Sequence, residues 1–283
     1  MPELPEVESV RRELAPRLAG TSVWSFQADT SRAIRSSRTE LQAVLSGATI
    51  QGLARKGKFL FFHLDKGVLL VHLGMSGRLR LVLDGASDEP APSPGGKLPR
   101  HCHFVAWLTD RRRLEFWDPR MFGRLQVFPP DSGELPALAR RLGPDPLGAE
   151  YRYETFIAAL ERRPGTRLKL LLLDQTFVAG VGNIYADEVL FRCAVRPDRV
   201  VRSLSVLERR RLFEEIPRLL EEAVAAGGTT WRDFLGTFGE RGRFAGRLLV
   251  YGREGRPCYA CGAAVRKIVL GGRGTHFCPH CQS

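Results

Sequence analysis

Four of the six cysteines lie in two pairs at the end of the chain, and their spacing restricts how this segment can fold. Each pair encloses two residues, and sixteen residues separate the pairs, which are Cys258 with Cys261 and Cys278 with Cys281. Two tight turns of this kind can direct four thiolates at one tetrahedral zinc ion. A segment this short buries too little surface to fold without such support. We therefore predict a hairpin over residues 258–283 held by one structural Zn2+ ion.

Two other interpretations of the cysteines are open. The two C-x-x-C pairs could be redox motifs, but a short tail without a metal would have no core. His276 or His280 could also replace one cysteine as a ligand, since both lie beside the second pair. Four protein ligands leave no open coordination position, so the predicted zinc is structural and not catalytic. Cys102 and Cys193 lie far away in sequence, and we expect them to be free thiols.

The segment between the two cysteine pairs is basic and rich in glycine. Arg266, Lys267 and Arg273 lie there, with three glycines around the last. A rigid hairpin with a basic tip suits insertion against DNA. A solvated surface turn would have the same composition, so the segment alone does not decide between the two.

The charge of the whole chain favours an anionic partner. Its 283 residues carry 43 basic and 31 acidic side chains, a net charge of +12, of which +8 falls in residues 151–283. Such an excess is typical of nucleic-acid binding, although a GC-rich genome would also enrich arginine. With 43% apolar residues and no apolar run of about 18, the sequence predicts no membrane span. The acidic first residues do not resemble a signal peptide, so we expect a cytoplasmic location, in the bacterial nucleoid.

The hydrophobic pattern divides the chain in two. After a short opening helix, residues up to 130 alternate as strands, which predicts an antiparallel sandwich or barrel. The proline- and glycine-rich segment 84–100 is expected to be a surface loop, and residues 131–150 a linker. The predicted strands are 59–64, 68–73, 78–83, 103–108 and 124–128.

From Tyr151 the apolar residues recur at helical spacing. Two of the expected helices flank the glycine-rich turn Gly180-Val181-Gly182-Asn183. Helical spacing ends at Gly227-Gly228, and residues 229–257 are expected to be a loop and connector before the cysteines. The predicted helices are 153–163, 166–174, 183–191 and 205–226.

The first residues offer a possible nucleophile. Initiator methionine is usually removed before a small residue such as Pro2, which would leave a secondary amine at the N-terminus. An α-amino group titrates near neutral pH, so part of it is an unprotonated nucleophile that can form a Schiff base. Glu3 would lie beside this amine and could move a proton. The acidic first turn of an ordinary helix would give the same pattern.

Four motifs occur together, and in combination they favour the catalytic interpretation of the N-terminus over an ordinary helix start. They are the opening Met1–Glu8 segment, the turn Asp118-Pro119-Arg120-Met121-Phe122-Gly123, the turn Gly180–Tyr185, and the four-cysteine finger. In this order and from end to end, the chain resembles the bacterial formamidopyrimidine-DNA glycosylase family, also called 8-oxoguanine DNA glycosylases.

This resemblance implies an α+β, multidomain fold and a base-excision repair activity. The enzyme would act as a bifunctional glycosylase and AP lyase on duplex DNA with an oxidised purine opposite cytosine, through a proline Schiff base and β,δ-elimination. We expect it to act as a monomer. The expected domains are an N-terminal antiparallel β-sandwich with the opening helix (1–130), the linker (131–150), a helix–two-turn–helix domain (151–228), a lesion-capping loop and connector (229–257), and the zinc finger (258–283).

The resemblance also implies site residues at matching positions of this sequence. Pro2, Glu3 and Lys58 correspond to the nucleophile, the general acid/base and a lysine near the lesion phosphate. Met75, Arg120 and Phe122 correspond to side chains that fill the space left by the flipped base, with Arg120 facing the orphaned cytosine. The further DNA-binding residues implied are Glu6, His72, Lys169, Asn183, Tyr251 and Arg273.

One departure and three competing interpretations accompany this resemblance. Met121 stands where relatives often have a second arginine. The endonuclease VIII-like branch, which acts on oxidised pyrimidines, usually has glycine where this chain has Leu4. A non-catalytic DNA-binding protein would be expected to lose Pro2, Glu3 or Lys58. A zinc-ribbon RNA-binding protein would not need the N-terminal motif.

Overall fold

The computed structural model describes residues 2–83, 93–130, 132–229, 237 and 242–283. The chain forms two compact units, which are described separately. The first contains residues 1–140 and 227–243, and the second contains residues 141–226 and 244–283. In the part of the chain that is described, no helix has the length and apolar character needed to cross a bilayer.

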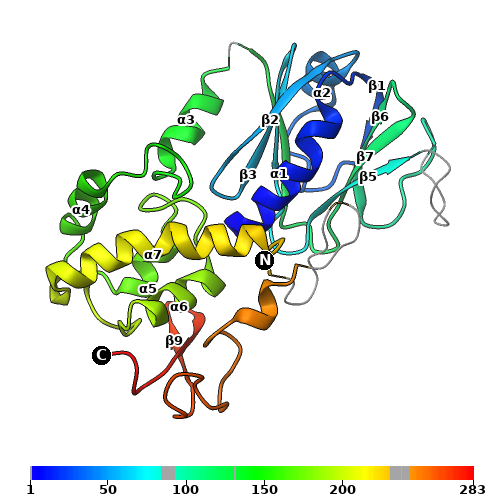
Figure 1. Ribbon diagram of the computed structural model, residues 1–283. Coiled ribbons are helices and arrows are strands. Elements are labelled where there is room, and N and C mark those ends of the chain that lie inside the picture. Colours follow the sequence, from blue (N-terminus) through cyan, green and yellow to red (C-terminus); the bar gives the residue numbers. More distant parts are fainter. Residues whose placement is uncertain (1, 84–92, 131, 230–236, 238–241) are drawn as a thin grey trace. The chain divides into compact units, whose positions relative to one another are not determined.

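The first unit is built around two antiparallel four-stranded sheets (Figure 1). One has the order β1-β6-β7-β5 and the other the order β2-β3-β4-β8. Apolar side chains from both sheets form one buried cluster, which makes the arrangement a sandwich. The strands are β1 (Val23–Ala28), β2 (Ile50–Lys56), β3 (Phe59–Leu64), β4 (Gly67–His72), β5 (Arg78–Leu83), β6 (Cys102–Leu108), β7 (Arg112–Trp117) and β8 (Arg124–Phe128).

Two helices pack on this core. Helix α1 (Leu4–Leu18) buries Val7, Val10 and Leu14 in the same cluster as the strands. Helix α2 (Arg38–Leu45) begins at Ser37, whose hydroxyl accepts the backbone N–H of Glu40 at 3.2 Å. This reciprocal capping box satisfies donors that a helix start leaves unpaired.

Part of the outer face of the β1-β6-β7-β5 sheet, along β6 and β7, is also buried. Arg113 and Glu115 on β7 form an ion pair there, and both are at most 2% exposed. Leu98 packs against the buried cluster that contains Trp107 on this face, and the carbonyl of Gly96 accepts the Gln27 amide at 2.6 Å. The described end of the predicted 84–100 loop therefore covers the sheet, while residues 84–92 lie outside the described residues.

The second unit is helical and ends in a small hairpin. Aromatic side chains pack between its helices; the rings of Tyr151 and Phe213, for example, stack at 4.7 Å. The elements are α4 (Tyr153–Glu161), α5 (Leu168–Leu173), α6 (Asn183–Arg192), η1 (Val201–Ser203), α7 (Val206–Ala225), η2 (Phe244–Arg247), β9 (Arg266–Leu270) and β10 (Arg273–Phe277).

The antiparallel sandwich, the helical region and the terminal hairpin are confirmed, and three predicted strands have the observed bounds. The predictions missed β1, β2, β7 and α2 altogether. The segment predicted as a linker contains α3 (Glu134–Arg141), whose Leu138 packs against Phe61 and Phe128. An eight-residue helix between prolines and glycines contains too few repeats of the hydrophobic pattern to be recognised from the sequence.

Candidate functional site

The N-terminal residues of the first unit lie at the start of α1. Pro2, Glu3 and Glu6 are all buried, with the two glutamates 1% exposed. Pro5, in the first helical turn, has the backbone angle that a helix start needs, and the acidic Glu6 in the same turn suits the helix dipole. The predicted removal of Met1 concerns a residue outside the described part of the chain. The structure thus brings the predicted nucleophile and both carboxylates to one helix end.

Glu6 uses its two oxygens to hold backbone. One accepts the N–H of Glu3 at 2.7 Å, and the other accepts the N–H of Thr229 at 2.6 Å. Gly228 has a φ of +80°, and a Cβ there would lie 2.8 Å from the Glu6 carboxylate. Glu6 therefore connects the helix start with the first residues of the predicted lesion-capping loop. Residues 230–236 and 238–241 of that loop lie outside the described residues.

Lys58 lies in the two-residue turn between β2 and β3, where Gly57 has a φ of +55°. Lys58 is 7% exposed. Arg55 anchors the turn by donating to the carbonyl of Gly57 at 3.1 Å and to the carboxylate of Glu8, on α1, at 2.9 Å. Burial raises the pKa of Glu8, but hydrogen bonds from Arg11, Arg55 and Arg12 bring it down to about 2. A permanently charged carboxylate thus ties α1 to the Lys58 turn.

His72 ends β4, beside this turn. Burial, followed by the positive charges of Lys58 and Arg124, lowers the pKa of His72 to about 4. Its Nδ1 accepts the N–H of Gly74 at 3.2 Å, so the neutral ring carries its hydrogen on Nε2. A neutral imidazole in this tautomer can donate one hydrogen bond to a phosphate oxygen.

Met75, Arg120 and Phe122 extend from two turns of the first unit, and we call these three side chains the wedge. Met75 is 37% exposed and Phe122 is 48% exposed, so both large apolar side chains are open to solvent. The Arg120 guanidinium lies over the Phe122 ring at 4.9 Å. The two turns touch, because a Cβ on Gly74 would lie 2.4 Å from the backbone carbon of Phe122.

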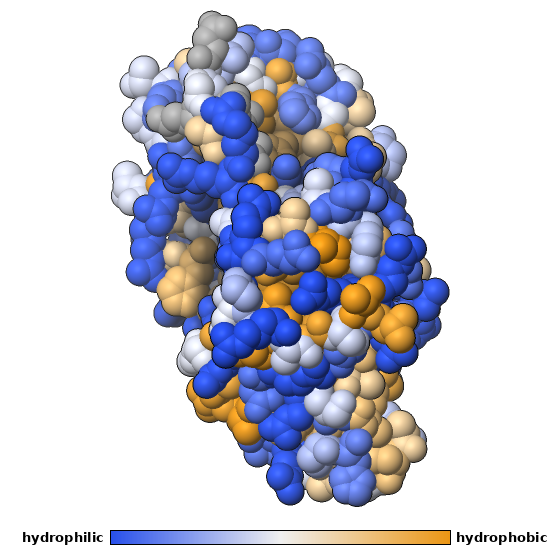
Figure 2. Space-filling model, turned by 90° about the vertical axis from the view of Figure 1, so that its left-hand side faces the viewer, coloured by the Kyte–Doolittle hydropathy of each residue, from blue (hydrophilic) through white to orange (hydrophobic). Residues whose placement is uncertain are grey.

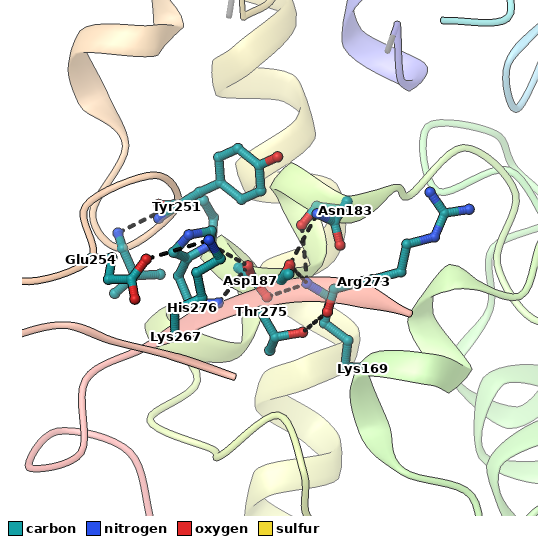
Figure 3. A network of polar contacts seen from close by, with 12 residues as sticks. Lys169, Asn183, Asp187, Tyr251, Glu254, Lys267, Arg273, Thr275 and His276 are labelled. Atoms are coloured by element: carbon teal, nitrogen blue, oxygen red, sulfur yellow. Dashed lines mark hydrogen bonds and ion pairs between the residues drawn. The ribbon is translucent and has the colours of Figure 1, made fainter. Parts of the chain in front are cut away.

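In the second unit, the glycine-rich turn leads into α6 at Asn183. The Asn183 amide donates to the carbonyl of Gly274, at the tip of the β9-β10 hairpin, at 3.1 Å (Figure 3). The neighbouring Arg273 is exposed, and its side chain points away from this polar network. The structure therefore brings two predicted phosphate-binding residues to one place.

Lys169 has a different environment from the one implied by the resemblance. Its side chain is fully buried in an ion pair with Asp187, also fully buried, and its Nζ lies 3.4 Å from the carbonyls of Asn183 and Gly274. Asp187 also accepts the backbone N–H of His276 at 2.9 Å. In this structure Lys169 joins the α6 turn to the hairpin and does not reach the surface.

Tyr251 is half-buried, and its backbone is held by a residue of α6. Its backbone N–H donates to Glu188 at 2.8 Å, and its ring contacts His276 with 5.0 Å between centroids. Glu188 also accepts the N–H groups of Leu249 and Val250. Burial raises the pKa of Glu188 although these three bonds lower it. Sequence reasoning missed Asp187 and Glu188, and their only signal was two adjacent carboxylates in an apolar helix.

The four predicted cysteine ligands come together at the base of the hairpin. Their sulfur atoms all lie within 4.8 Å of one another, with 3.5 Å between Cys261 and Cys278 and 3.9 Å between Cys258 and Cys281. Four sulfurs at about 2.3 Å from a tetrahedral zinc ion would be separated by about 3.8 Å, so the cluster fits this metal. His276 instead faces Asp187, and the candidate metal group among the described residues is formed by the cysteines.

Family models match three consecutive parts of the chain. The formamidopyrimidine-DNA glycosylase N-terminal domain matches residues 1–125, and the H2TH domain of the same family matches residues 142–234. A zinc finger found in FPG and IleRS matches residues 255–283. Together these models account for most of both units.

A relative and two solved structures agree with these models. The formamidopyrimidine-DNA glycosylase of Heliobacterium modesticaldum is 42% identical, and the alignment covers 100% of both chains. The crystal structure of MutM (Fpg) from Thermus thermophilus is 43% identical, with a TM-score of 0.85 over 99% of this chain and 98% of that one. A Lactococcus lactis FPG mutant in complex with Fapy-dG-containing DNA has 35% identity and a TM-score of 0.88, with both chains fully covered. The chain therefore belongs to the formamidopyrimidine-DNA glycosylase family.

Proposed function

We propose that this protein is a bifunctional DNA glycosylase and AP lyase that removes oxidised purines from duplex DNA during base-excision repair. The observation that carries this proposal is the buried Pro2-Glu3 pair at the start of α1, in a chain of this family. A secondary amine beside a carboxylate provides a nucleophile and a proton-transfer group within one dipeptide.

The reaction begins with the Pro2 amine, once exposed by removal of Met1. Its lone pair attacks C1′ of the damaged nucleotide, and the bond between C1′ and the base breaks. Glu3 delivers a proton to the ring oxygen of the sugar as the ring opens, and a Schiff base forms between Pro2 and C1′. Elimination follows: loss of a proton from C2′ breaks the C3′–O bond, and loss of a proton from C4′ then breaks the C5′–O bond, so that both phosphates are released, with Glu3 assisting proton transfer. Hydrolysis frees the proline.

Charged groups around the N-terminus support this chemistry. Lys58, in the turn that Arg55 anchors, contacts the phosphate near the lesion, and the His72 Nε2–H donates to a phosphate of the same strand. Glu6 fixes the Glu3 backbone and holds the start of the lesion-capping loop. Glu6 also helps to hold the flipped nucleoside, since each carboxylate oxygen can accept a second hydrogen bond.

The remaining residues hold the DNA in its flipped state. The wedge fills the space of the extruded nucleotide, and Arg120 donates to the orphaned cytosine. Asn183 and Arg273 bind the phosphates beside the lesion, while Tyr251 packs near it. Lys169 acts as a positioning residue, since its ion pair with Asp187 sets the α6 turn against the hairpin. Strongly hydrophilic residues cover much of the face in Figure 2, with apolar patches between them.

The cysteine cluster holds one zinc ion with a structural role, because the four thiolates complete its coordination. The protein acts as a monomer in the bacterial cytoplasm, at the nucleoid. Its preferred lesion site has cytosine opposite the oxidised purine, which Arg120 recognises.

The proposal also concerns which oxidised bases the enzyme accepts. Wild-type Lactococcus lactis FPG has been solved with DNA containing an oxidised pyrimidine, at 35% identity to this chain. This observation favours a second activity on pyrimidine lesions, the preference of the endonuclease VIII-like branch.

A base-release assay tests the proposal. Duplexes with 8-oxoguanine opposite cytosine, 8-oxoguanine opposite adenine, or an oxidised pyrimidine opposite guanine would be compared under single-turnover conditions. We expect the fastest release with cytosine opposite the purine, and loss of release in Glu3→Gln. Equal rates on all three duplexes, or full activity in Glu3→Gln, would contradict the proposed specificity or mechanism.

A further inference from the structure

The turns that carry the wedge share one buried carboxylate, that of Asp118. This side chain is fully buried although it stands between β7 and an exposed turn. One oxygen accepts the Ser76 hydroxyl at 2.6 Å and the N–H of Arg120 at 3.2 Å, and the other accepts the N–H of Gly123 at 2.6 Å. A carboxylate away from water is stable only when such donors surround it. The contacts come from both wedge turns, one that follows Met75 and one that encloses Phe122.

A second pair of polar side chains holds the backbone of Asp118. The carbonyl of Asp118 accepts the Nε2–H of His103 at 2.9 Å, and the Nδ1 of His103 lies 2.6 Å from the carboxylate of Asp29. His103 is 6% exposed, so its ring is held between Asp29 and the Asp118 carbonyl. This chain of contacts prevents the Asp118 backbone from rotating and directs its carboxylate into the wedge turns.

The outward side of the turn is held by an arginine. Arg32 donates to the carbonyls of Arg120 and Met121, each at 3.1 Å, and lies 5.4 Å from the centre of the Phe122 ring. Met121 has a φ of +52°, a strained conformation for a residue with a side chain, which persists only when neighbours enforce it. Asp118 from inside and Arg32 from outside therefore fix a turn that would otherwise relax.

From these contacts we infer that Asp118 is a positioning residue of the reaction: it joins the Met75 turn to the Arg120–Phe122 turn, so that the wedge enters DNA as one rigid element. This inference rests on the proposed function, because it assigns Asp118 a part in base extrusion. Ser76 is the link between the turns, and the His103–Asp29 pair fixes the direction of the carboxylate. Preorganised side chains lose less conformational entropy on insertion, which lowers the barrier to extrusion.

The test compares Asp118→Ala, Asp118→Asn and Ser76→Ala with Ser22→Ala. Ser22 is the matched control, because its hydroxyl bonds the Thr49 hydroxyl at 2.9 Å in the same unit and touches neither wedge turn. Each variant would be assayed for excision of 8-oxoguanine from duplex DNA, opposite cytosine and opposite adenine, and for strand cleavage at a preformed abasic site in single-stranded DNA. Single-stranded DNA has no orphaned base, so its cleavage reports on the N-terminal chemistry without the wedge.

We expect Asp118→Ala to slow duplex excision roughly a hundredfold, the scale of a lost positioning contact, and Ser76→Ala to slow it about tenfold. Single-strand cleavage should stay within about twofold of the wild type, because this reaction does not use the wedge. A twofold change in rate corresponds to less free energy than one hydrogen bond contributes. The preference for cytosine over adenine should fall in Asp118→Ala, because Arg120 is no longer directed, and Asp118→Asn should recover part of it.

Two outcomes would overturn the inference. In the first, Asp118→Ala equals Ser22→Ala in duplex excision and opposite-base preference. In the second, Asp118→Ala loses duplex and single-strand cleavage in equal measure, which indicates a general loss of the folded site. If the wild-type protein itself excises no oxidised base, the proposed function fails instead, and this result is distinct from both.

Discussion

At the residue scale, the proposed chemistry depends on a lone pair at the N-terminus. Pro2→Gly keeps an amine, now a primary one, in a buried position beside Glu3. We expect this variant to retain part of its strand-cleavage activity, because a primary amine also forms a Schiff base. Single-turnover cleavage of abasic-site DNA would measure it. A protein whose N-terminal amine is acetylated is the control, and any cleavage by that protein would refute the mechanism.

His72 should make stability depend on pH. Its pKa falls from the ordinary 6.5 to about 4 in the folded chain, chiefly through burial. Between these values the unfolded chain binds a proton that the folded chain does not bind. The contribution of His72 to the free energy of unfolding is therefore fully present above pH 6.5. It is lost as the pH falls to 4, which lowers the free energy of unfolding by up to roughly 3 kcal/mol.

Denaturant titrations between about pH 4 and pH 7 would test this dependence. His72→Gln should flatten the profile, and His63→Gln, an exposed histidine on the neighbouring strand β3, should leave it unchanged. Equal profiles for wild type and His72→Gln would show that His72 is protonated normally in the folded chain.

At the element scale, the strands that the sequence predicted are those with a clear apolar pattern. The strand β7 was missed because Arg112, Arg113 and Glu115 look like an exposed segment, whereas Arg113 and Glu115 are buried together. Helix α2 carried a usable signal in the spacing of Ser37 and Glu40, a capping box. Pairing of charges inside the protein depends on tertiary contacts, which local patterns do not encode.

The site residues also divide into those that local motifs predict and those that depend on tertiary contacts. Motif positions indicated Pro2, Glu3 and the cysteine ligands, because their chemistry depends on local spacing. The motifs could not reveal that Lys169 is buried against Asp187, since the partner lies eighteen residues away on another helix. The ion pair forms because the fold brings α5, α6 and the hairpin together.

The Lys169–Asp187 pair supports a prediction about stability. Lys169→Met leaves the Asp187 carboxylate buried without its cation, and we expect a loss of about 3–5 kcal/mol. The double variant with Asp187→Asn removes both charges and keeps an acceptor for the His276 N–H, so it should recover much of this loss. Urea denaturation of the two single variants and the double variant measures the coupling. Additive losses would show that the two side chains do not stabilise each other.

The hairpin should depend on its metal. Chelation of zinc is expected to unfold β9 and β10, because these strands lie between Val265 and Cys278, which belong to a small buried cluster with the ligand Cys258. Hydrogen exchange of the backbone amides in 266–277 would report the loss of structure. Cys193→Ser, which alters a buried thiol outside the cluster, should keep both zinc and protection. Protection that survives complete removal of zinc would contradict the structural role.

At the scale of the whole molecule, the net charge of +12 should appear in the salt dependence of DNA binding. Each phosphate contact that releases a counterion adds about one unit to the slope of log affinity against log salt. Arg273→Ala should lower this slope by about one, equally for different sequences. Arg210→Ala is the control, because this exposed arginine is paired with Glu214. An unchanged slope for Arg273→Ala would remove it from the DNA contacts.

The measurement that tests the central claim most directly is borohydride trapping. The full-length protein would be incubated with duplex DNA containing 8-oxoguanine opposite cytosine, reduced, digested and mapped by mass spectrometry. The account predicts one covalent adduct on the amine of Pro2, with Met1 absent from the same peptide. An adduct on a lysine such as Lys58, or excision and strand cleavage without a trapped adduct, would contradict it.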